Sequence, residues 1–354
     1  MLKALSLFSG AGIGETYESE ADIKTVVANE LIAKRAEIYK YRFPDVNMIT
    51  GDIKENKKKI IKEAKQEQID IIIATPPCQG MSSAGKRNYE TDKRNFLIFD
   101  VLDIIDELLP NYVFIENVPK FLQMEYFDKN GELKSITNIL KEKYSGIYNI
   151  KFGVYDAADY GVPQHRKRNI IRLFKKGLEW NEPEKQKHIT VREAIGHLPS
   201  LESGEASNIK YHIAPVCNEK HILWLKHTPT GKSAFENPVY YPQKENGEKI
   251  KAFANTYKRI SWDKPCPTRT MNYRISGSNN VHPGRLKPDG TYSDARPLTL
   301  LELLIVSSLP ENIRFPEGTT EKTIRDVIGE GIPPKMSLAF FKKIKKFEKF
   351  SKFT

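Results

Sequence analysis

The sequence predicts an α/β protein, with a parallel sheet in a large first domain and a second, smaller domain of irregular structure. Two observations carry this prediction. Short apolar runs alternate with helical stretches in the first part of the chain, as in sheets whose parallel strands are joined by helices. From about Glu179 to Asp294 this alternation gives way to Pro, Gly, Lys and aromatic residues. A chain of 354 residues with 39% hydrophobic content is long enough to bury two cores.

The charge balance favours a polyanionic partner. Lysine and arginine number 56 against 45 acidic residues, which leaves a net charge of +11 and a pI near 9.2. Such a surface suits nucleic acid, because cations that neutralise phosphates release counterions and bind without regard to sequence. A generally lysine-rich composition is the alternative. No apolar run approaches the ~20 residues that a membrane helix needs, so no membrane partner is expected.

The cysteines favour a reducing, cytoplasmic setting. Cys78, Cys217 and Cys266 show no paired spacing, and their number is odd. The chain begins directly with a strand pattern and not with a signal peptide, which agrees with a cytoplasmic protein. The histidines near Cys217 match no standard zinc spacing, so we expect no metal site.

The first strand, residues 3–8, runs into a glycine-rich turn, residues 9–15, and then into a stretch expected to be helical. Such a turn cradles a nucleoside cofactor, because glycine lets the backbone approach the ligand closely. Gly10, Gly12 and Gly14 have the spacing Gly-x-Gly-x-Gly, which does not meet the nicotinamide fingerprint. The turn therefore predicts a nucleoside site without naming the cofactor.

The next two strands end in acidic residues. Residues 25–28 form the second strand, and Glu30 follows it about 20 positions after the glycine turn, where a carboxylate accepts from ribose hydroxyls. The third strand ends near Thr50, and Asp52 follows it. Asp52 is either a cofactor contact or the N-cap of a helix over residues 54–65, and the two roles are compatible.

A cysteine follows the fourth strand, residues 69–73, in the turn Thr75-Pro76-Pro77-Cys78-Gln79. The prolines end the strand and restrict the backbone, so the cysteine is held at the carboxyl end of a strand, where open sheets bind ligands. The alternative is a small buried residue in a tight turn. Residues 80–94 are polar, basic and long for a loop, which predicts a lid or a binding loop.

A helix is expected over residues 95–109. Its predicted inward-facing residues are Phe96, Phe99, Leu102, Ile105 and Leu109. The strand over residues 112–115 then ends in Glu116. Burial at a strand end would raise the pKa of this carboxyl group, as a proton donor near neutral pH requires. A salt bridge or a helix cap is the alternative for Glu116.

An alternating set of donors precedes the strand over residues 169–174. The period of two puts Gln164, Arg166 and Arg168 on one face of an extended segment. Arginine forks suit phosphate and the carbonyl oxygens of bases. A solvated edge strand is the alternative. A last amphipathic helix, with one apolar and one basic face, is expected over residues 335–350.

In this order, the motifs resemble those of the cytosine-5 DNA methyltransferases, in particular the prokaryotic enzymes of restriction-modification systems. The resemblance extends from Leu5 to Pro334. The matching motifs are Phe8-Ser9-Gly10-x-Gly12, Glu30, Asp52, Pro77-Cys78-Gln79-x-x-Ser82, Glu116-Asn117-Val118, Gln164-x-Arg166-x-Arg168, Arg296-x-Leu298-Thr299-x-x-Glu302 and a late Gly-x-x-x-Pro-Pro.

The resemblance implies a Rossmann-like domain that binds S-adenosylmethionine, residues 1–189 completed by residues 325–354. It also implies a target-recognition domain, residues 190–324. The expected reaction moves a methyl group to carbon-5 of a cytosine in a specific double-stranded DNA sequence. In that reaction a cysteine thiolate adds to carbon-6 of a flipped-out base. The expected partners are double-stranded DNA and a separate cognate restriction endonuclease, and the expected state is a monomer.

The resemblance also assigns roles to single residues. The catalytic residues it implies are Cys78, Glu116, Arg166 and Arg168, with Glu116 at N3 of cytosine and Arg168 at its O2. The cofactor-binding residues it implies are Phe8, Ser9, Gly10, Gly12, Glu30, Leu31, Asp52, Ile53, Pro77 and Leu97. The expected contacts with nucleic acid are Gln79, Ser82, Lys86, Arg87, Gln164, Arg269 and Arg274, the last two from short polar stretches of the second domain.

Two other functions share parts of this pattern. A transfer-RNA branch of the same family carries these motifs, and an inactive homologue could keep the fold to hold DNA. The long region between Arg168 and Arg296 favours DNA, and intact Cys78, Glu116 and Arg168 favour an active enzyme. One departure is Glu330, where the family usually has Asn, which leaves that cofactor contact open. The residues do not give the DNA sequence that is recognised.

Overall fold

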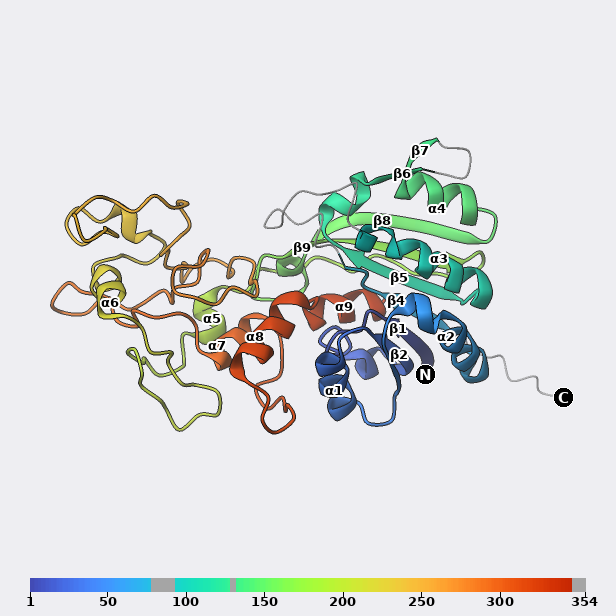
Figure 1. Cartoon of the computed structure of the whole chain (residues 1–354), viewed down its shortest axis with the longest axis horizontal. Coiled ribbons are helices and arrows are strands. Elements are labelled where there is room, and N and C mark those ends of the chain that lie inside the picture. Colours follow the sequence, from blue (N-terminus) through green and yellow to red (C-terminus); the bar gives the residue numbers. More distant parts are fainter. Residues whose placement is uncertain (78–92, 128–131, 346–354) are drawn as a thin grey trace. The chain divides into compact units, whose positions relative to one another are not determined.

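The computed structural model describes residues 1–77, 93–127 and 132–345 (Figure 1). The chain divides into two compact units, each considered separately below. The first unit comprises Met1–Asp156, Lys167–Lys185 and Pro334–Thr354, and the second comprises Ala157–Arg166 and Gln186–Pro333.

These units differ in detail from the two domains predicted above. The structure groups residues 157–166, 186–189 and 325–333 with the second unit. The assignment of catalysis to one unit and of recognition to the other is a statement about function and stays a prediction.

Among the described residues, a seven-stranded sheet forms the centre of the first unit, in the order β3-β2-β1-β4-β5-β9-β8. Its strands are β1 (Leu2–Leu7), β2 (Ile23–Glu30), β3 (Asn47–Thr50), β4 (Ile71–Ala74), β5 (Tyr112–Asn117), β8 (Tyr148–Asp156) and β9 (Lys167–Lys175). β1 to β5 are parallel, whereas β9 is antiparallel to both β5 and β8. A separate hairpin pairs β6 (Glu125–Phe127) with β7 (Leu133–Ser135). The predicted parallel α/β architecture is confirmed.

Helices cover both faces of the sheet. The helical elements of the first unit are α1 (Ala33–Arg42), α2 (Ile53–Glu67), α3 (Leu97–Leu108), α4 (Ile136–Tyr144) and α9 (Pro334–Phe341), with 3-10 turns η1 (Glu18–Ala21), η2 (Lys93–Phe96) and η3 (Pro119–Gln123). Val113 of β5 belongs to the core formed with α2, α3 and α4. The next residue, Phe114, contacts Phe340 and Phe341 at the end of α9. Because successive side chains of a strand point to opposite faces, the sheet is the middle of three layers.

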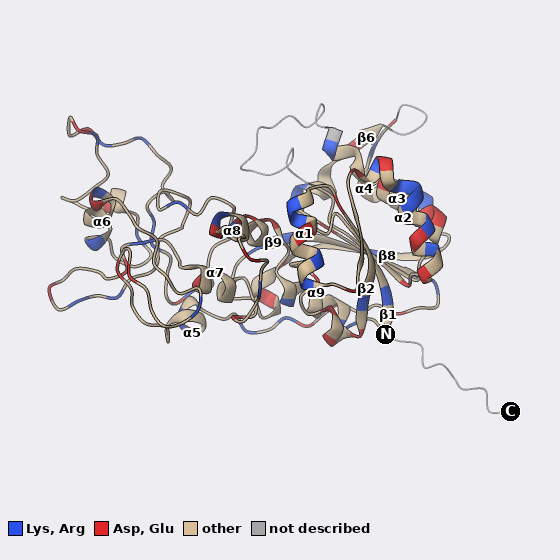
Figure 2. Ribbon diagram, turned by 60° about the horizontal axis from the view of Figure 1, so that its bottom comes forward, with Lys and Arg blue, Asp and Glu red and all other residues tan. Residues whose placement is uncertain are grey.

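Part of the basic character of α2 is neutralised locally. Lys57 pairs with Asp100 at 2.7 Å and with Asp103 at 2.5 Å, and Lys65 pairs with Glu107 at 2.8 Å. Figure 2 shows this mixture of blue and red on α2 and α3. On this side of the sheet, part of the positive charge is therefore neutralised within the protein and is not available to bind a polyanion.

Several predicted elements differ from those observed. The stretch after Glu15 forms turns and the short η1 and not a longer helix. The helix predicted over residues 335–350 ends at Phe341, and its last predicted residues lie outside the described part of the chain. Phe96 and Leu109 were predicted to face inward, but each is 42% exposed, because the helix itself covers Leu97–Leu108 and both residues flank it.

The second unit is largely irregular, as predicted. Its helical elements are α5 (Val191–Ile195), α6 (Glu219–Lys226), α7 (Leu300–Val306), α8 (Glu321–Glu330), η4 (Ala157–Tyr160) and η5 (Ala234–Glu236). Two small apolar clusters, one around Trp262 and one around Trp224, supply its core. Across the described residues, no helix has the length and apolarity needed to cross a membrane.

Candidate active site

The candidate site lies at the carboxyl ends of the parallel strands in the first unit. β1 lies between β2 and β4, so the chain leaves β1 toward one neighbour and later returns to its other side. Open α/β sheets bind ligands in the crevice at such a switch point. Thr75, just after β4, donates its hydroxyl to the carbonyl oxygen of Phe8, just after β1, at 3.0 Å. This bond joins the two strand ends that border the crevice.

The glycine turn after β1 has a backbone that favours glycine. Phe8, Gly10 and Gly12 have φ values of 58°, 56° and 70°, in the left-handed region. A Cβ atom on Gly10 would meet none of the described residues within 4 Å, so within this part of the chain the turn is open on that side. A Cβ on Gly12 would come within 2.5 Å of the Phe43 ring, so Gly12 is required by packing against α1. The two glycines thus serve different purposes, one open to a ligand and one closed against the protein.

Arg42, at the end of α1, holds this turn from inside the protein. Its Nη1 donates to the carbonyl oxygens of Ala11 at 2.7 Å and Gly12 at 2.8 Å, and its Nη2 donates to the Thr16 hydroxyl at 2.8 Å. Burial lowers the pKa of Arg42 to about 10, so the guanidinium stays charged at neutral pH. Arg42 was not predicted as part of the site, because nothing in its local sequence connects it with a turn about thirty positions earlier.

Two buried carboxyl groups, Glu15 and Glu18, follow the glycines of this turn, and Glu15 interacts with the charge of Arg42. Glu15 accepts from the Ser6 hydroxyl at 2.5 Å, and Glu18 accepts from the backbone N–H and the hydroxyl of Thr25 at 2.8 and 2.7 Å. Burial raises the pKa of Glu15. Burial, and then the nearby Glu15, raise the pKa of Glu18 to about 8. The glycine turn is therefore supported by two carboxyl groups whose pKa values burial raises, and Glu18, with a pKa of about 8, is largely protonated at neutral pH.

Glu30, at the end of β2, is buried and already oriented. Its Oε2 accepts from the N–H of Gly10 and its Oε1 from the N–H of Ile32, both at 2.9 Å. Arg35 lies 3.9 Å from Oε1. A carboxylate oxygen can accept more than one hydrogen bond, so Glu30 retains acceptor capacity for a hydroxyl. Its fixed position beside Gly10 matches the place predicted for a ribose contact.

Asp52 is the N-cap of α2, as one of the two sequence interpretations held. Its Oδ1 accepts from the N–H of Lys54 at 2.8 Å. The neighbouring strand ends are tied together by Asn29, whose side chain donates to the carbonyl oxygens of Ile49 and Gly51 at 2.8 and 3.0 Å. Ile53 is buried, whereas Leu31 is 62% exposed. An exposed apolar side chain next to a buried carboxylate is consistent with a surface that a planar ring covers.

The turn after β4 is held by β5. Asn117, 2% exposed, donates its amide to the carbonyl oxygen of Pro76 at 3.1 Å, while its Oδ1 accepts from the N–H of Val118 at 2.8 Å. Pro77 is half-buried, and so is Leu97 at the start of α3. The predicted residues Cys78, Gln79, Ser82, Lys86 and Arg87 lie outside the described residues.

Glu116 and Arg168 form the charged pair of the site. Arg168 Nε lies 2.7 Å from Glu116 Oε1, and the two side chains are 14% and 10% exposed. β5 and β9 are antiparallel, with Glu116 opposite Ile170, so Arg168 is the diagonal neighbour of Glu116 on the same face. The salt bridge named as the alternative for Glu116 is therefore present, and it does not conflict with a role in binding a base.

Gln164 and Arg166 lie in the second unit and make different contacts. Gln164 is buried, donates to the Val306 carbonyl oxygen at 3.3 Å, and accepts from the N–H of Arg269 at 2.9 Å. Arg166 is also buried and donates to the carbonyl oxygens of Arg269 and Gly329, both at 2.8 Å. Their predicted contacts with DNA and with the catalytic centre stay predictions, and these internal bonds do not favour them.

The two arginines predicted to contact DNA in the second unit differ in exposure. Arg269 is 5% exposed, and its guanidinium donates to the carbonyl oxygen of Asn279 at 2.7 Å and to the side chain of Asn280 at 3.1 Å. Arg274 is exposed, and its backbone carbonyl accepts from Asn280 at 2.9 Å. Both contacts with DNA stay predictions, but only Arg274 presents its side chain to solvent.

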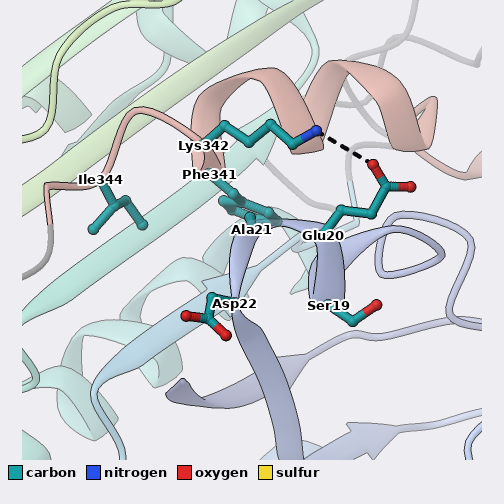
Figure 3. A pocket seen from close by; sticks show the side chains of 7 residues that line it. All are labelled: Ser19, Glu20, Ala21, Asp22, Phe341, Lys342 and Ile344. Atoms are coloured by element: carbon teal, nitrogen blue, oxygen red, sulfur yellow. Dashed lines mark hydrogen bonds and ion pairs between the residues drawn. The ribbon is translucent and has the colours of Figure 1, made fainter.

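Two other features contribute nothing to this site. An open recess lies between η1 and the end of α9, where Lys342 pairs with Glu20 at 3.2 Å (Figure 3). The backbone carbonyl oxygen of Asp22, which also lines the recess, accepts from the N–H of Leu2 at the start of β1. The recess therefore lies at the opposite end of this strand from the glycine turn. Within the described ranges, no three His, Cys, Asp or Glu side chains form a group that could hold a metal ion.

The fold and the site together define a class of protein. A parallel sheet with a glycine turn and a fixed carboxylate at its switch point is the architecture of α/β enzymes that bind a nucleoside cofactor. Residues 2–346 match the family described as C-5 cytosine-specific DNA methylase. The chain belongs to this family, and it is a DNA cytosine-5 methyltransferase.

Individual relatives agree with this assignment. The chain is 51% identical over 340 residues to the type II methyltransferase M1.HgaI of Avibacterium volantium, covering 94% of this chain and 95% of that protein. It is 26% identical over 343 residues to the type II methyltransferase M1.HphI of Haemophilus parahaemolyticus, covering 96% and 85%.

Solved structures share the fold. A structure described as a prophage-encoded DNA modification methyltransferase of E. coli superposes with a TM-score of 0.70 at 20% identity, over 97% of this chain and 98% of that chain. The Entamoeba histolytica methyltransferase EhMeth gives a TM-score of 0.64 at 17% identity, over 96% of each chain.

Proposed function

We propose that this enzyme uses S-adenosylmethionine to methylate carbon-5 of a cytosine within a specific double-stranded DNA sequence, as the modification enzyme of a type II restriction-modification system. The observation that carries the proposal is the Glu116–Arg168 pair at the end of β5, beside the Asn117–Pro76 bond, in a chain of this family. A cognate endonuclease that acts separately is part of the proposal, and so are a cytoplasmic location and a monomeric enzyme.

The residues at the switch point fit the cofactor. Gly10 is open on the side where a Cβ would be, and Glu30 is oriented by two backbone N–H groups to accept from ribose hydroxyls. In this proposal Phe8, Ser9 and Gly12 complete the turn, and the remaining contacts are Leu31, Asp52, Ile53, Pro77 and Leu97. When bound, S-adenosylmethionine supplies an electrophilic methyl group.

The reaction requires a nucleophile from the enzyme, because carbon-5 of cytosine is itself too weak a nucleophile to attack the methyl group directly. The Cys78 thiolate adds to carbon-6, and the electron pair released into the ring lets carbon-5 form its bond to the methyl group while the methyl–sulfur bond breaks and S-adenosylhomocysteine leaves. The proton then leaves carbon-5, the bond between carbon-6 and sulfur breaks, and the thiolate is restored. Cys78 is outside the described residues, so its role rests on the Pro77-Cys78-Gln79 motif.

Glu116 and Arg168 meet the charge that develops on the ring. Glu116 binds the N3 edge of the base and Arg168 its O2, where negative charge accumulates after addition. The 2.7 Å ion pair supports this assignment, because it holds two groups of opposite charge next to each other before the base arrives. Neither group then needs a large rearrangement in the transition state.

The target atom cannot be reached inside a duplex, so the base must leave the stack. The second unit is proposed to read the duplex, and exposed Arg274 is its best candidate for a contact with a base or a phosphate. The net charge of +11 supports binding to phosphates. RNA as the substrate and an inactive binding protein were the alternatives in the sequence analysis, and the family description, which names DNA methylation, disfavours both.

The test is methylation of a mixed-sequence plasmid with the purified enzyme and S-adenosylmethionine, followed by bisulfite sequencing. We expect one short sequence to be protected at a single cytosine. The Cys78→Ser enzyme should give no protection, whereas Cys217→Ser, a control at a half-buried cysteine of the second unit, should keep it. Protection of no DNA by the wild-type enzyme, or full activity of Cys78→Ser, would overturn the proposal.

A second readout tests the covalent step. DNA carrying 5-fluorocytosine at the site found above has no proton to lose from carbon-5, so the wild-type enzyme should form an adduct that survives denaturant. Lack of such an adduct on an otherwise methylated site would count against thiolate addition while leaving the substrate assignment intact.

A further inference from the structure

The ends of β5 and β9 carry two neighbouring pairs of side chains on opposite faces of the sheet. Glu116 and Arg168 form the charged pair on one face. The next residue of each strand, Asn117 and Asn169, are direct partners in the β5–β9 register. Direct partners point to the same face, with Cβ atoms about 4.5–5.5 Å apart. The two asparagines therefore lie side by side, immediately behind the pair that is proposed to bind the base.

The two asparagines differ in their hydrogen bonding. Asn117 uses both ends of its amide, on Pro76 and Val118. Asn169 is 0% exposed, and neither its Nδ2 nor its Oδ1 has a hydrogen-bond partner among the residues that the structure describes. η3 packs against β9, and the alternate residues Ile171 and Leu173 on the same face belong to the apolar core. A carboxamide in such surroundings is unfavourable unless another state of the protein gives it partners.

We propose that Asn169 is a positioning residue of the methyl-transfer reaction, which pairs with the Asn117 amide when a cytosine occupies Glu116 and Arg168 and thereby fixes the turn after Pro76. This inference rests on the proposed function. Asn117 has one amide hydrogen and one lone pair beyond the bonds already described, so an amide–amide contact with Asn169 requires no loss of the bond to Pro76.

The path from the base to the turn is short. A base bound to Glu116 and Arg168 adds contacts to the two strand ends that also carry Asn117 and Asn169. Closing the amide pair then holds Asn117 against Pro76, two residues before the proposed nucleophile. The unpaired amide of the free enzyme favours this closure, because the closed state satisfies groups that are otherwise buried without partners.

The experiment compares two variants of nearly equal shape, Asn169→Val and Asn169→Thr. Both remove the amide, but threonine keeps a hydroxyl that can bond to Asn117. We expect kcat to fall about tenfold or more in Asn169→Val, since small misplacements of a nucleophile have effects of this size. Asn169→Thr should lose clearly less. The affinity for S-adenosylmethionine should be unchanged in both, and Asn169→Val should melt at the same or a higher temperature than the wild type.

The rate of adduct formation on 5-fluorocytosine DNA separates the possible outcomes. Slower trapping by Asn169→Val, with the wild-type enzyme trapping normally, supports the proposal. Trapping rates and kcat values equal to those of the wild type in both variants overturn it. An equal loss of kcat in Asn169→Val and Asn169→Thr also overturns it, because it would indicate an effect of packing alone. A wild-type enzyme that forms no adduct is a failure of the proposed function and is recognised as such without any variant.

Two further variants complete the test. If Asn169 acts through Asn117, adding Asn169→Val to Asn117→Ala should cause no further loss of kcat. Ser337→Ala is the matched control, because Ser337 is also a buried residue whose hydroxyl has no partner in the described part of the chain. Removal of this hydroxyl should leave kcat unchanged. Should Asn169→Val fold poorly, Asn169→Ala gives the same comparison with Asn169→Ser. A fully additive loss in the Asn117 and Asn169 double variant would contradict the positioning role.

Discussion

Both units bury pairs of carboxyl groups beside arginines, but the balance of charge differs between them. In the first unit, Glu15 and Glu18 lie below the glycine turn, and Arg42 is the cation that acts on Glu15. In the second unit, Asp294 and Glu302 both bond to Arg296, at 2.7 and 2.9 Å, and Asp294 also acts on the buried Arg259.

The pKa directions follow this balance. Burial raises the pKa of both Glu15 and Glu18, and one arginine does not compensate for it. Burial would also raise the pKa of Asp294 and Glu302, but the charges of His282 and Arg296 lower both. Hydrogen bonds from Ser200 and Ser293 to Asp294, and from Arg296 to Glu302, lower them further. A buried carboxylate is therefore kept ionised where cations and donors match it in number, and becomes sensitive to pH where they do not.

The difference has a structural meaning. The second unit has little regular secondary structure, so a balanced, fully bonded cluster of buried charges takes over part of the role of a core. The first unit has a large apolar core and needs no such cluster. Its carboxyl groups lie instead under the turn proposed to hold the cofactor.

The largest effect is expected from removing the cation of the second unit. Arg296→Met leaves Asp294 and Glu302 buried without their main partner, and breaking such a group costs about 3–5 kcal/mol of unfolding free energy. Urea unfolding followed by tryptophan fluorescence measures it. Arg192→Met, which breaks an exposed pair with Asp263, is the control and should leave the midpoint in place. Equal midpoints for both variants would remove the idea of a structural charge cluster.

Arg42→Met should have a smaller effect. Burial already raises the pKa of Glu15, and loss of the Arg42 charge raises it further, so protonation of this carboxyl group becomes easier and offsets part of the cost. What is lost are the bonds to Ala11, Gly12 and Thr16, about 2–3 kcal/mol together. Cofactor binding, measured by calorimetry, should weaken as the turn loosens. If Arg42→Met lost as much unfolding free energy as Arg296→Met, the two clusters would have the same balance of cations and carboxyl groups.

The sequence was sufficient where the signal is local. Parallel strands, the glycine turn, the N-cap Asp52 and the irregular second unit follow from apolar runs, glycines and capping chemistry. β8 was not predicted, because it is an edge strand whose residues are mostly half-buried or exposed and give no clear alternation. Local patterns cannot distinguish Arg269 from Arg274, since burial depends on partners such as Asn279 and Asn280 that are several residues away.

The pH dependence of stability gives a third comparison. The pKa of Glu18 is about 8 in the folded protein and about 4.5 in the unfolded chain. Between these two pH values the folded state holds the proton, and unfolding releases it. The unfolding free energy should therefore fall as pH rises, by about 2 kcal/mol between pH 5 and 7 from this group. Glu18→Gln keeps the contacts with Thr25 approximately and should remove this fall in urea titrations at the two pH values. An unchanged slope would mean that Glu18 is ionised in the folded protein.

The smallest effect comes from His282, which lies 3.5 Å from Glu302 in the second unit. Burial lowers the pKa of His282 to about 4, so the histidine remains neutral beside a cluster whose charges are already matched. Between about pH 4 and 6.5 the unfolded chain binds this proton and the folded one does not, so stability should rise with pH, by about 1 kcal/mol from pH 5 to 6. Over that interval Glu18 acts in the opposite direction with a similar slope. If the two units unfold in one transition, the wild-type protein should show almost no change between pH 5 and 6. As the pH rises from 5 to 6, His282→Asn should then lose stability and Glu18→Gln should gain it. Equal slopes of unfolding free energy against pH in the two variants would show that the two clusters do not differ in their balance of charge.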